Sequence, residues 1–84
     1  MARYLVMVMR KPTFDVALAP AHNAFLDALR AQQRIELSGP FTDKTGGAYL
    51  LRAASLAEAV DIAHSDPLHV EGASTVTVHE WNAV

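Results

Sequence analysis

Cysteine is absent from this chain of 84 residues, which excludes disulfide bonds and argues against a structural zinc site. The sequence also lacks any apolar run near the roughly 20 residues that a membrane-spanning helix needs. Its first apolar stretch ends at Arg10 and Lys11, too early for a good secretory signal, so we expect a cytoplasmic protein. A small core without disulfides is only marginally stable, which leaves self-association as the expected support.

Positive charge is scarce as well. The sequence contains seven Lys and Arg residues and nine Asp and Glu residues, which gives a formal net charge of −2. This negative balance argues against a nucleic acid partner. No basic residue follows Arg52, although several acidic ones do, and such an acidic segment is usually a solvated face. Because 51% of the residues are hydrophobic and 19% are charged, residues 1–84 are expected to form a single globular domain.

The hydrophobic pattern predicts two helices and four strands. The strands are expected over residues 3–9, 35–38, 48–52 and 74–81, and the helices over residues 20–33 and from the N-cap Ser55 to about Ser65. Ser55 and Glu58 have the spacing of a capping box. The segment Ser38-Gly39-Pro40 is interpreted as the turn that closes the second strand. Asp66-Pro67 should end the second helix and cap a short helical turn over 67–70.

Several side chains are assigned to the inner faces of these helices. The first helix is expected to bury Ala21, Phe25, Leu26, Ala28, Leu29 and Ala31, and the second helix Leu56, Ala59, Val60 and Ala63. Residues 3–9 are apolar on both sides of the predicted strand, so this strand needs cover on both faces.

The element order β-α-β-β-α-β predicts an α+β, ferredoxin-like fold with a four-stranded antiparallel sheet in the spatial order 4-1-3-2. Both helices would cover one face of this sheet. The other face would carry one apolar set of residues 3–9, a patch too large for a soluble monomer. We therefore expect a homodimer that joins the two open sheet faces about a twofold axis.

The same topology brings three polar segments to one end of the sheet: His22, Ser38-Gly39-Pro40 and Asp66. A half-buried histidine in the first turn of a helix can act as a base near neutral pH. A carboxylate bonded to it would orient the ring and raise its basicity. Each segment also has a structural interpretation: a histidine at the edge of the core, an ordinary turn and a helix cap.

Other chemistry finds less support in the sequence. His64, Asp66 and His69 match no strong ligand spacing, so no metal is expected. Gly46 and Gly47 lack the context of a phosphate-binding loop. Ser38 is not in a nucleophile elbow, so a Ser-His-Asp hydrolase is not indicated.

Five features spread over nearly the whole chain resemble the YCII-related family of small dimeric α+β-barrel proteins. They are His22 early in the first helix, Ser38-Gly39-Pro40, the helix start Ser55–Ala59, Asp66-Pro67, and Gly72 before the last strand. The resemblance implies a fold similar to that of the muconolactone isomerases and the antibiotic-biosynthesis monooxygenases. It also implies that His22 and Asp66 correspond to the acid/base pair proposed in the family, of which one member looks like a dehydrochlorinase of a hydroxylated chloroaromatic.

Two hypotheses of different class follow. In the first, the protein is a cofactor-free lyase or isomerase, similar to a dehydrochlorinase or a muconolactone isomerase. His22 would transfer the proton and Asp66 would hold and polarise His22, while Ser38, Gly39 and Pro40 would bind a small cyclic or hydroxylated aromatic compound. In the second, the protein is a non-catalytic dimeric module for small-molecule binding or an accessory role, and the pair only stabilises the fold. A cofactor-free monooxygenase is a third option, suggested by analogy of fold alone.

Overall fold

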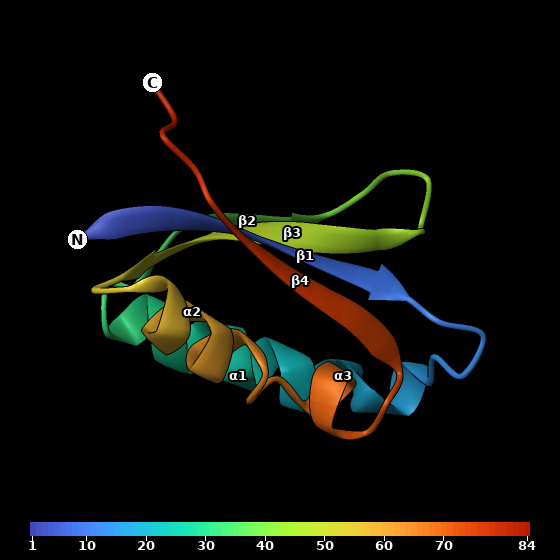
Figure 1. The fold of residues 1–84 in the computed structure, drawn as a ribbon. Coiled ribbons are helices and arrows are strands. Elements are labelled where there is room, and N and C mark those ends of the chain that lie inside the picture. The colour runs from blue at the N-terminus through green and yellow to red at the C-terminus, as the bar shows by residue number, and fades with distance from the viewer.

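A computed structural model of residues 1–84 shows one four-stranded antiparallel sheet with all the helices on a single face (Figure 1). The elements are β1 (Ala2–Arg10), the 3-10 helix η1 (Val16–Leu18), α1 (Ala19–Ala31), β2 (Ile35–Pro40), β3 (Gly46–Ala53), α2 (Leu56–Ala63), α3 (Pro67–Val70) and β4 (Ser74–Glu80). The strand order is β2-β3-β1-β4, which is the predicted order counted from the other edge. The predicted α+β, ferredoxin-like fold is therefore confirmed.

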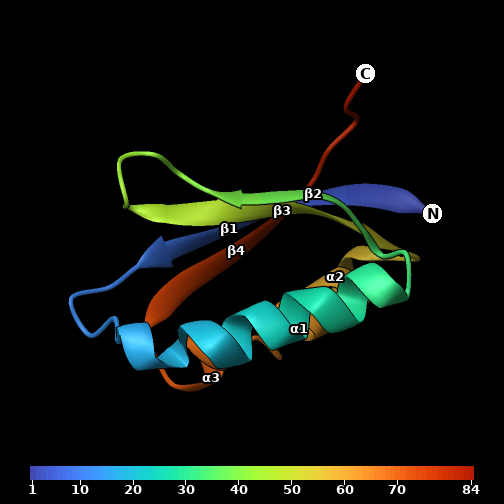
Figure 2. The ribbon, with the colours of Figure 1, turned by 180° about the vertical axis from the view of Figure 1, so that it is seen from behind.

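The two faces of β1 have different surroundings. Tyr4 and Val6 point toward the helices and are almost completely buried, whereas Leu5 and Met7 point to the open face and are half-buried. Seen from behind, the ribbon shows α1 running beneath β2 and β3, and nothing covers the opposite side of the sheet (Figure 2). The core of the chain thus lies in one layer, between the sheet and the helices.

None of the helices has the length and apolar character needed to cross a membrane.

The helix α1 has Pro20 in its first turn. Backbone N–H groups in the first turn have no partner within the helix, so the missing N–H of proline costs no hydrogen bond there. Leu29 is buried, and Phe25 and Leu26 pack against the core as expected. Ala21, Ala28 and Ala31 are exposed, so that part of the prediction was wrong. The reason is that only a narrow stripe of α1 meets the sheet, and small alanines flank this stripe on the outer side.

The helix α2 keeps half of its predicted capping box. The Ser55 hydroxyl accepts a hydrogen bond from the Glu58 N–H at 3.1 Å. The Glu58 carboxylate, however, accepts bonds from the Ala54 N–H at 3.2 Å and from Arg34 at 2.7 Å. Leu56 is 49% exposed, which contradicts its predicted burial. The buried stripe follows Ala59, Ile62 and Ala63, so Leu56 lies outside the contact with the sheet.

The interpretation of Ser38-Gly39-Pro40 as a turn was wrong. These residues continue β2 and pair with β3, in the register Ser38 with Tyr49, Gly39 with Ala48 and Pro40 with Gly47. Proline is tolerated here because β2 is an edge strand, where one N–H of the backbone needs no partner in the sheet. β3 likewise begins at Gly46, so the loop between the two strands spans only residues 41–45.

The ion pair between Arg34 and Glu58 predicts an acid-sensitive contribution to stability. The hydrogen bond from Arg34 lowers the pKa of Glu58 below its ordinary value of 4.5. A carboxyl whose pKa is lowered by folding stabilises the protein above its unfolded pKa, and this contribution disappears as the pH falls through the folded pKa. Glu58→Gln should therefore be less stable than the parent near neutral pH, and the two should converge as the pH falls through the lowered pKa of Glu58.

Chemical denaturation at a series of pH values measures this difference. Asp61→Asn, an exposed carboxylate on the same helix, is the matched control and should show no such convergence. A gap between Glu58→Gln and the parent that stays constant down to about pH 3 would contradict the prediction.

Candidate functional site

His22 and Asp66 are in direct contact. His22 lies in the first turn of α1, and Asp66 lies at the junction of α2 and α3. The Nδ1 atom of His22 is 2.8 Å from Oδ2 and 3.0 Å from Oδ1 of Asp66, across a separation of 44 residues in the sequence. The Asp66 side chain is fully buried, whereas the His22 side chain is 20% exposed. The carboxylate thus lies behind the imidazole, and only the imidazole reaches solvent.

This contact determines which ring nitrogen is free. An ionised carboxylate only accepts hydrogen bonds, so Nδ1 of His22 is the donor in this pair. In the neutral ring the other nitrogen, Nε2, then carries the lone pair and can accept a proton. The contact therefore orients the ring and leaves Nε2 as the nitrogen that can accept a hydrogen bond or a proton.

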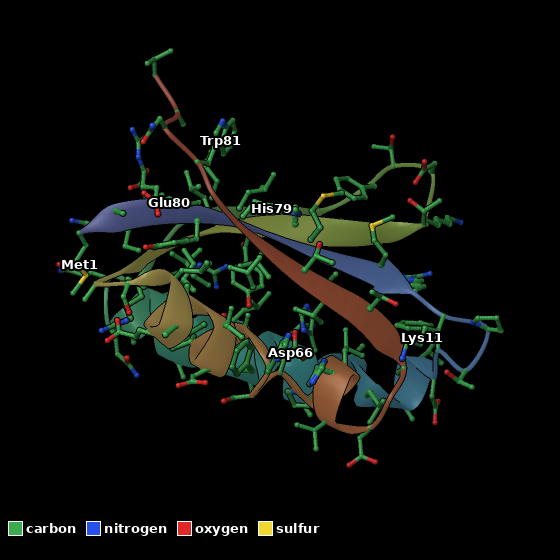
Figure 3. The ribbon with its side chains drawn as sticks, in the orientation of Figure 1. Met1, Lys11, Asp66, His79, Glu80 and Trp81 are labelled. Atoms are coloured by element: carbon green, nitrogen blue, oxygen red, sulfur yellow. The ribbon has the colours of Figure 1, made fainter.

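Asp66 is also the N-cap of α3, as the sequence predicts. Its Oδ1 atom accepts a hydrogen bond from the Leu68 N–H at 2.9 Å. The structural and the functional interpretations of this residue are thus compatible, because one carboxylate serves both contacts. Figure 3 shows Asp66 on the helix side of the sheet, where α2 gives way to α3. Two independent contacts hold the carboxylate in one orientation behind His22.

A cavity of about 580 Å³ opens beside His22, between α1 and the helix-covered face of the sheet. Ser38, Gly39 and Pro40 line it from β2, so the structure brings the predicted segment and the predicted base to one site. This volume is in the range of pockets that bind small organic molecules. Asp66 does not line the cavity, because its buried side chain lies behind His22.

The Ser38 hydroxyl already has a partner in the protein. It accepts a hydrogen bond from Nη2 of Arg30 at 2.7 Å, and Nη1 of Arg30 donates to Asp27 at 2.7 Å. Arg30 lines the same cavity and was not singled out from the sequence. The signal was present: His22, Leu26 and Arg30 recur every four residues, which places them on one face of α1.

Two buried hydroxyl groups in the cavity wall have no hydrogen-bond partner, those of Tyr49 and Ser74. Burial raises the pKa of the Tyr49 hydroxyl, and the nearby charge of Asp66 adds to this effect. The phenol therefore stays protonated and remains a hydrogen-bond donor. Neither hydroxyl was assigned to the site from the sequence.

The remaining histidines take no part in this site. The rings of His64 and His69 stack on each other, with centroids 4.0 Å apart and planes 5° from parallel. Asp66 turns toward His22, so the three side chains with the suggestive spacing do not converge. His79 lies on the open face of the sheet, near Trp81 (Figure 3).

Comparison with known proteins gives consistent results. The family model of the YCII-related domain matches residues 2–82. The chain is 46% identical over 81 residues to the uncharacterized protein YjpA of Bacillus subtilis (strain 168), which covers 96% of this chain and 95% of YjpA.

A solved structure with a similar fold is the 5-chloro-2-hydroxyhydroquinone dehydrochlorinase TftG from Burkholderia phenoliruptrix AC1100, in complex with 2,5-dihydroxybenzoquinone. The TM-score is 0.77 at 23% identity, over 98% of this chain and 95% of that chain. At this level of identity the likeness shows a shared fold.

Proposed function

This chain belongs to the YCII-related family, and from that premise we propose that it is a cofactor-free lyase or isomerase of the cytoplasm that acts on a small cyclic or hydroxylated aromatic compound. The observation that carries the proposal is that His22, with Asp66 bonded behind it, lies in the wall of a cavity large enough for one substituted ring. A buried carboxylate bonded to a partly exposed imidazole is the arrangement that general-base catalysis uses.

The proposed chemistry is a proton transfer at the substrate ring. Nε2 of His22 takes a proton from a ring carbon or hydroxyl, and the electron pair left behind forms a new double bond. In a lyase, the leaving group departs with the electron pair of its own bond to carbon. In an isomerase, the proton returns from Nε2 to a different carbon. Asp66 keeps its negative charge throughout and stabilises the imidazolium that forms.

The name of the structural neighbour suggests a first substrate to test. TftG is named as a dehydrochlorinase of 5-chloro-2-hydroxyhydroquinone. Loss of hydrogen chloride from such a ring needs proton transfer and no redox cofactor. A proton moves from one hydroxyl to the carbon that carries chlorine, a second hydroxyl then gives its proton to a base, and chloride departs with the electron pair of its bond as that oxygen becomes a carbonyl, which leaves a quinone. The His22–Asp66 pair supplies such a base.

Two measurements on the purified protein test the proposal. The first is chloride release from 5-chloro-2-hydroxyhydroquinone, which reports elimination. The second is exchange of ring hydrogens with deuterium from the solvent, measured for a panel of hydroxylated rings, which reports proton transfer. We expect the protein to make at least one of these reactions faster than it is in buffer without protein. If the protein binds these compounds but accelerates neither reaction for any of them, the non-catalytic binding module becomes the better description.

We also infer that two copies of the chain associate through the open face of the sheet. This face exposes Leu37 (71%) and Trp81 (48%), next to half-buried Leu5 and Met7 from β1. Figure 3 shows Trp81 and His79 on the side of the sheet away from the helices. An apolar patch of this kind on so small a chain is the usual mark of an interface. The C2 symmetry expected for a dimer would bring each patch against its own copy.

A charge placed on this face should weaken the dimer. Leu37→Lys is expected to raise the dissociation constant about 10- to 100-fold, because the lysine loses its hydration in an apolar contact. Sedimentation equilibrium measures the mass, which should be twice the chain mass of 9.1 kDa for the parent. Val70→Lys is the matched control: Val70 is 66% exposed and lies on α3, away from the open face. A parent protein that sediments as a monomer at all concentrations would contradict the inference.

A further inference from the structure

Arg10 is the arginine of this chain that has no carboxylate partner. The others each lie within 4.0 Å of an Asp or Glu oxygen: Arg3, Arg30, Arg34 and Arg52. The guanidinium of Arg10 instead lies over the ring of Phe14, 4.2 Å from its centroid, and both residues line the cavity beside His22. Stacking on an aromatic face orients a guanidinium but leaves the N–H donors at its edge free.

The charge of Arg10 is not cancelled by the rest of the cavity wall. Asp27, which also lines the cavity, is paired with Arg30 at 2.7 Å. Asp66 is fully buried behind His22 and bonded to it. Among the charged side chains that line the cavity, Arg10 is therefore the one without an oppositely charged partner, and its charge is positive. A positive group in a partly enclosed cavity attracts anions more strongly than one in open solvent.

Hydroxyl donors lie along the same wall. Ser74 is the direct cross-strand partner of Arg10 in the pairing of β1 with β4, so both side chains are on the helix-covered face, with Cβ atoms about 5 Å apart. Ser74 and Tyr49 are 1% and 2% exposed, and neither hydroxyl has a partner in the protein. Leaving a buried hydroxyl unpaired costs stability, and a bound oxygen atom in the cavity would remove that cost.

We propose that this cavity selects a small ring compound that carries an ionised oxygen, with Arg10 binding the oxyanion and the hydroxyls of Ser74 and Tyr49 donating hydrogen bonds to the oxygens of the ring. The inference rests on the proposed function for the position of the site, and it adds the substrate class to it. A cation that lines the same cavity as the base also favours the reaction, because negative charge grows on the ring as its proton moves to His22.

Calorimetric titration with a matched pair of probes tests this inference. The anion is 2,5-dihydroxybenzoquinone near pH 7, where its acidic hydroxyls are ionised, and the neutral analogue is its dimethyl ether. The parent should bind the anion at least about 10-fold more tightly than the ether. Arg10→Gln should weaken binding of the anion about 10- to 100-fold and abolish the preference. Lys11→Gln, which removes the neighbouring charge outside the cavity, should bind like the parent.

The hydroxyl groups are tested by near-isosteric variants. Ser74→Ala and Tyr49→Phe should each weaken binding of the anion several-fold, up to about 10-fold, without lowering the melting temperature of the free protein, because each removes an unpaired buried group. An unchanged affinity in Arg10→Gln would overturn the inference. So would a parent protein that fails to bind the anion or that prefers the ether.

This experiment separates the inference from the proposed reaction. Anion binding that depends on Arg10, without any proton transfer, would support the inference and contradict the lyase or isomerase. Proton transfer that depends on His22 but is unchanged in Arg10→Gln would support the lyase or isomerase and contradict the inference about Arg10.

Discussion

Replacing His22 by alanine is expected to reduce the rate of proton transfer about 100- to 10,000-fold, the range in which a positioned general base contributes to catalysis. The reason is that His22 lines the cavity, and the buried Asp66 carboxylate is bonded to its Nδ1 atom, which leaves Nε2 free to accept a proton. The turnover number for chloride release or for deuterium exchange measures this effect. Added imidazole should restore part of the rate in His22→Ala, because it can occupy the space that the ring leaves.

Asp66→Asn tests the other half of the pair. The asparagine oxygen can still cap α3 through the Leu68 N–H, but one oxygen acceptor becomes an amide donor opposite Nδ1 of His22. The free nitrogen of His22 would then tend to carry the proton instead of accepting one, so the rate should fall as well. Asp61→Asn, on the exposed side of α2, is the control and should keep the activity of the parent.

Melting temperatures alone do not separate the catalytic from the structural interpretation of the pair. His22→Ala leaves the fully buried Asp66 carboxylate with the Leu68 N–H as its remaining donor, which should cost about 1–3 kcal/mol whether or not the pair is catalytic. Activity decides between them. A His22→Ala variant with the turnover of the parent would exclude His22 as the base.

Gly46→Ala is expected to destabilise the fold by about 3 kcal/mol or more, the largest effect on stability that we predict for a single methyl group. A Cβ atom at Gly46 would overlap the carbonyl oxygen of Val8 and lie 2.9 Å from Cα of Met9, both in the backbone of β1. The backbone at Gly46 also has a φ of +155°, which L-residues rarely adopt. Because β1 is a central strand, it cannot move away without disturbing its pairing with β4.

Thermal unfolding measures this effect. For a chain of this size, a loss of about 3 kcal/mol lowers the melting temperature by roughly 12–24 °C. Gly39→Ala is the matched control, because a Cβ atom there meets nothing within 4 Å, and its melting temperature should stay within a few degrees of the parent. Equal melting temperatures for the two variants would contradict the prediction, because they would mean that the β1 backbone moves to accommodate the new Cβ atom at little cost.

Much of the fold could be predicted from the sequence because its signals are local. The apolar run in residues 3–9, the helix start at Ser55 and the stop at Asp66-Pro67 each depend on a few neighbouring residues, and the structure shows elements at each of them. Chain topology then led to the expectation that His22 and Asp66 are neighbours, and the two side chains lie within hydrogen-bond distance. Their catalytic role remains a prediction.

The errors occurred where a local signal was ambiguous. Gly39 and Pro40 are typical of turns, yet the pairing with β3 keeps them in an edge strand. Leu56 fits the apolar spacing of α2, but the sheet contacts a neighbouring stripe of that helix and leaves it 49% exposed. In both cases the outcome depends on a partner that lies elsewhere in the chain.

By itself, the sequence determined the order of the elements, the helix caps and the two apolar faces of β1, since periodicity and capping are properties of adjacent residues. Only the tertiary structure decided which polar groups in the cavity have partners: Arg30 is paired with Asp27 and Ser38, whereas Arg10 has no carboxylate partner and the hydroxyls of Ser74 and Tyr49 have no hydrogen-bond partner in the protein. The physical reason is that hydrogen bonds and ion pairs act over a few ångströms in space. Whether a group finds a partner therefore depends on how distant segments pack, which no local pattern encodes.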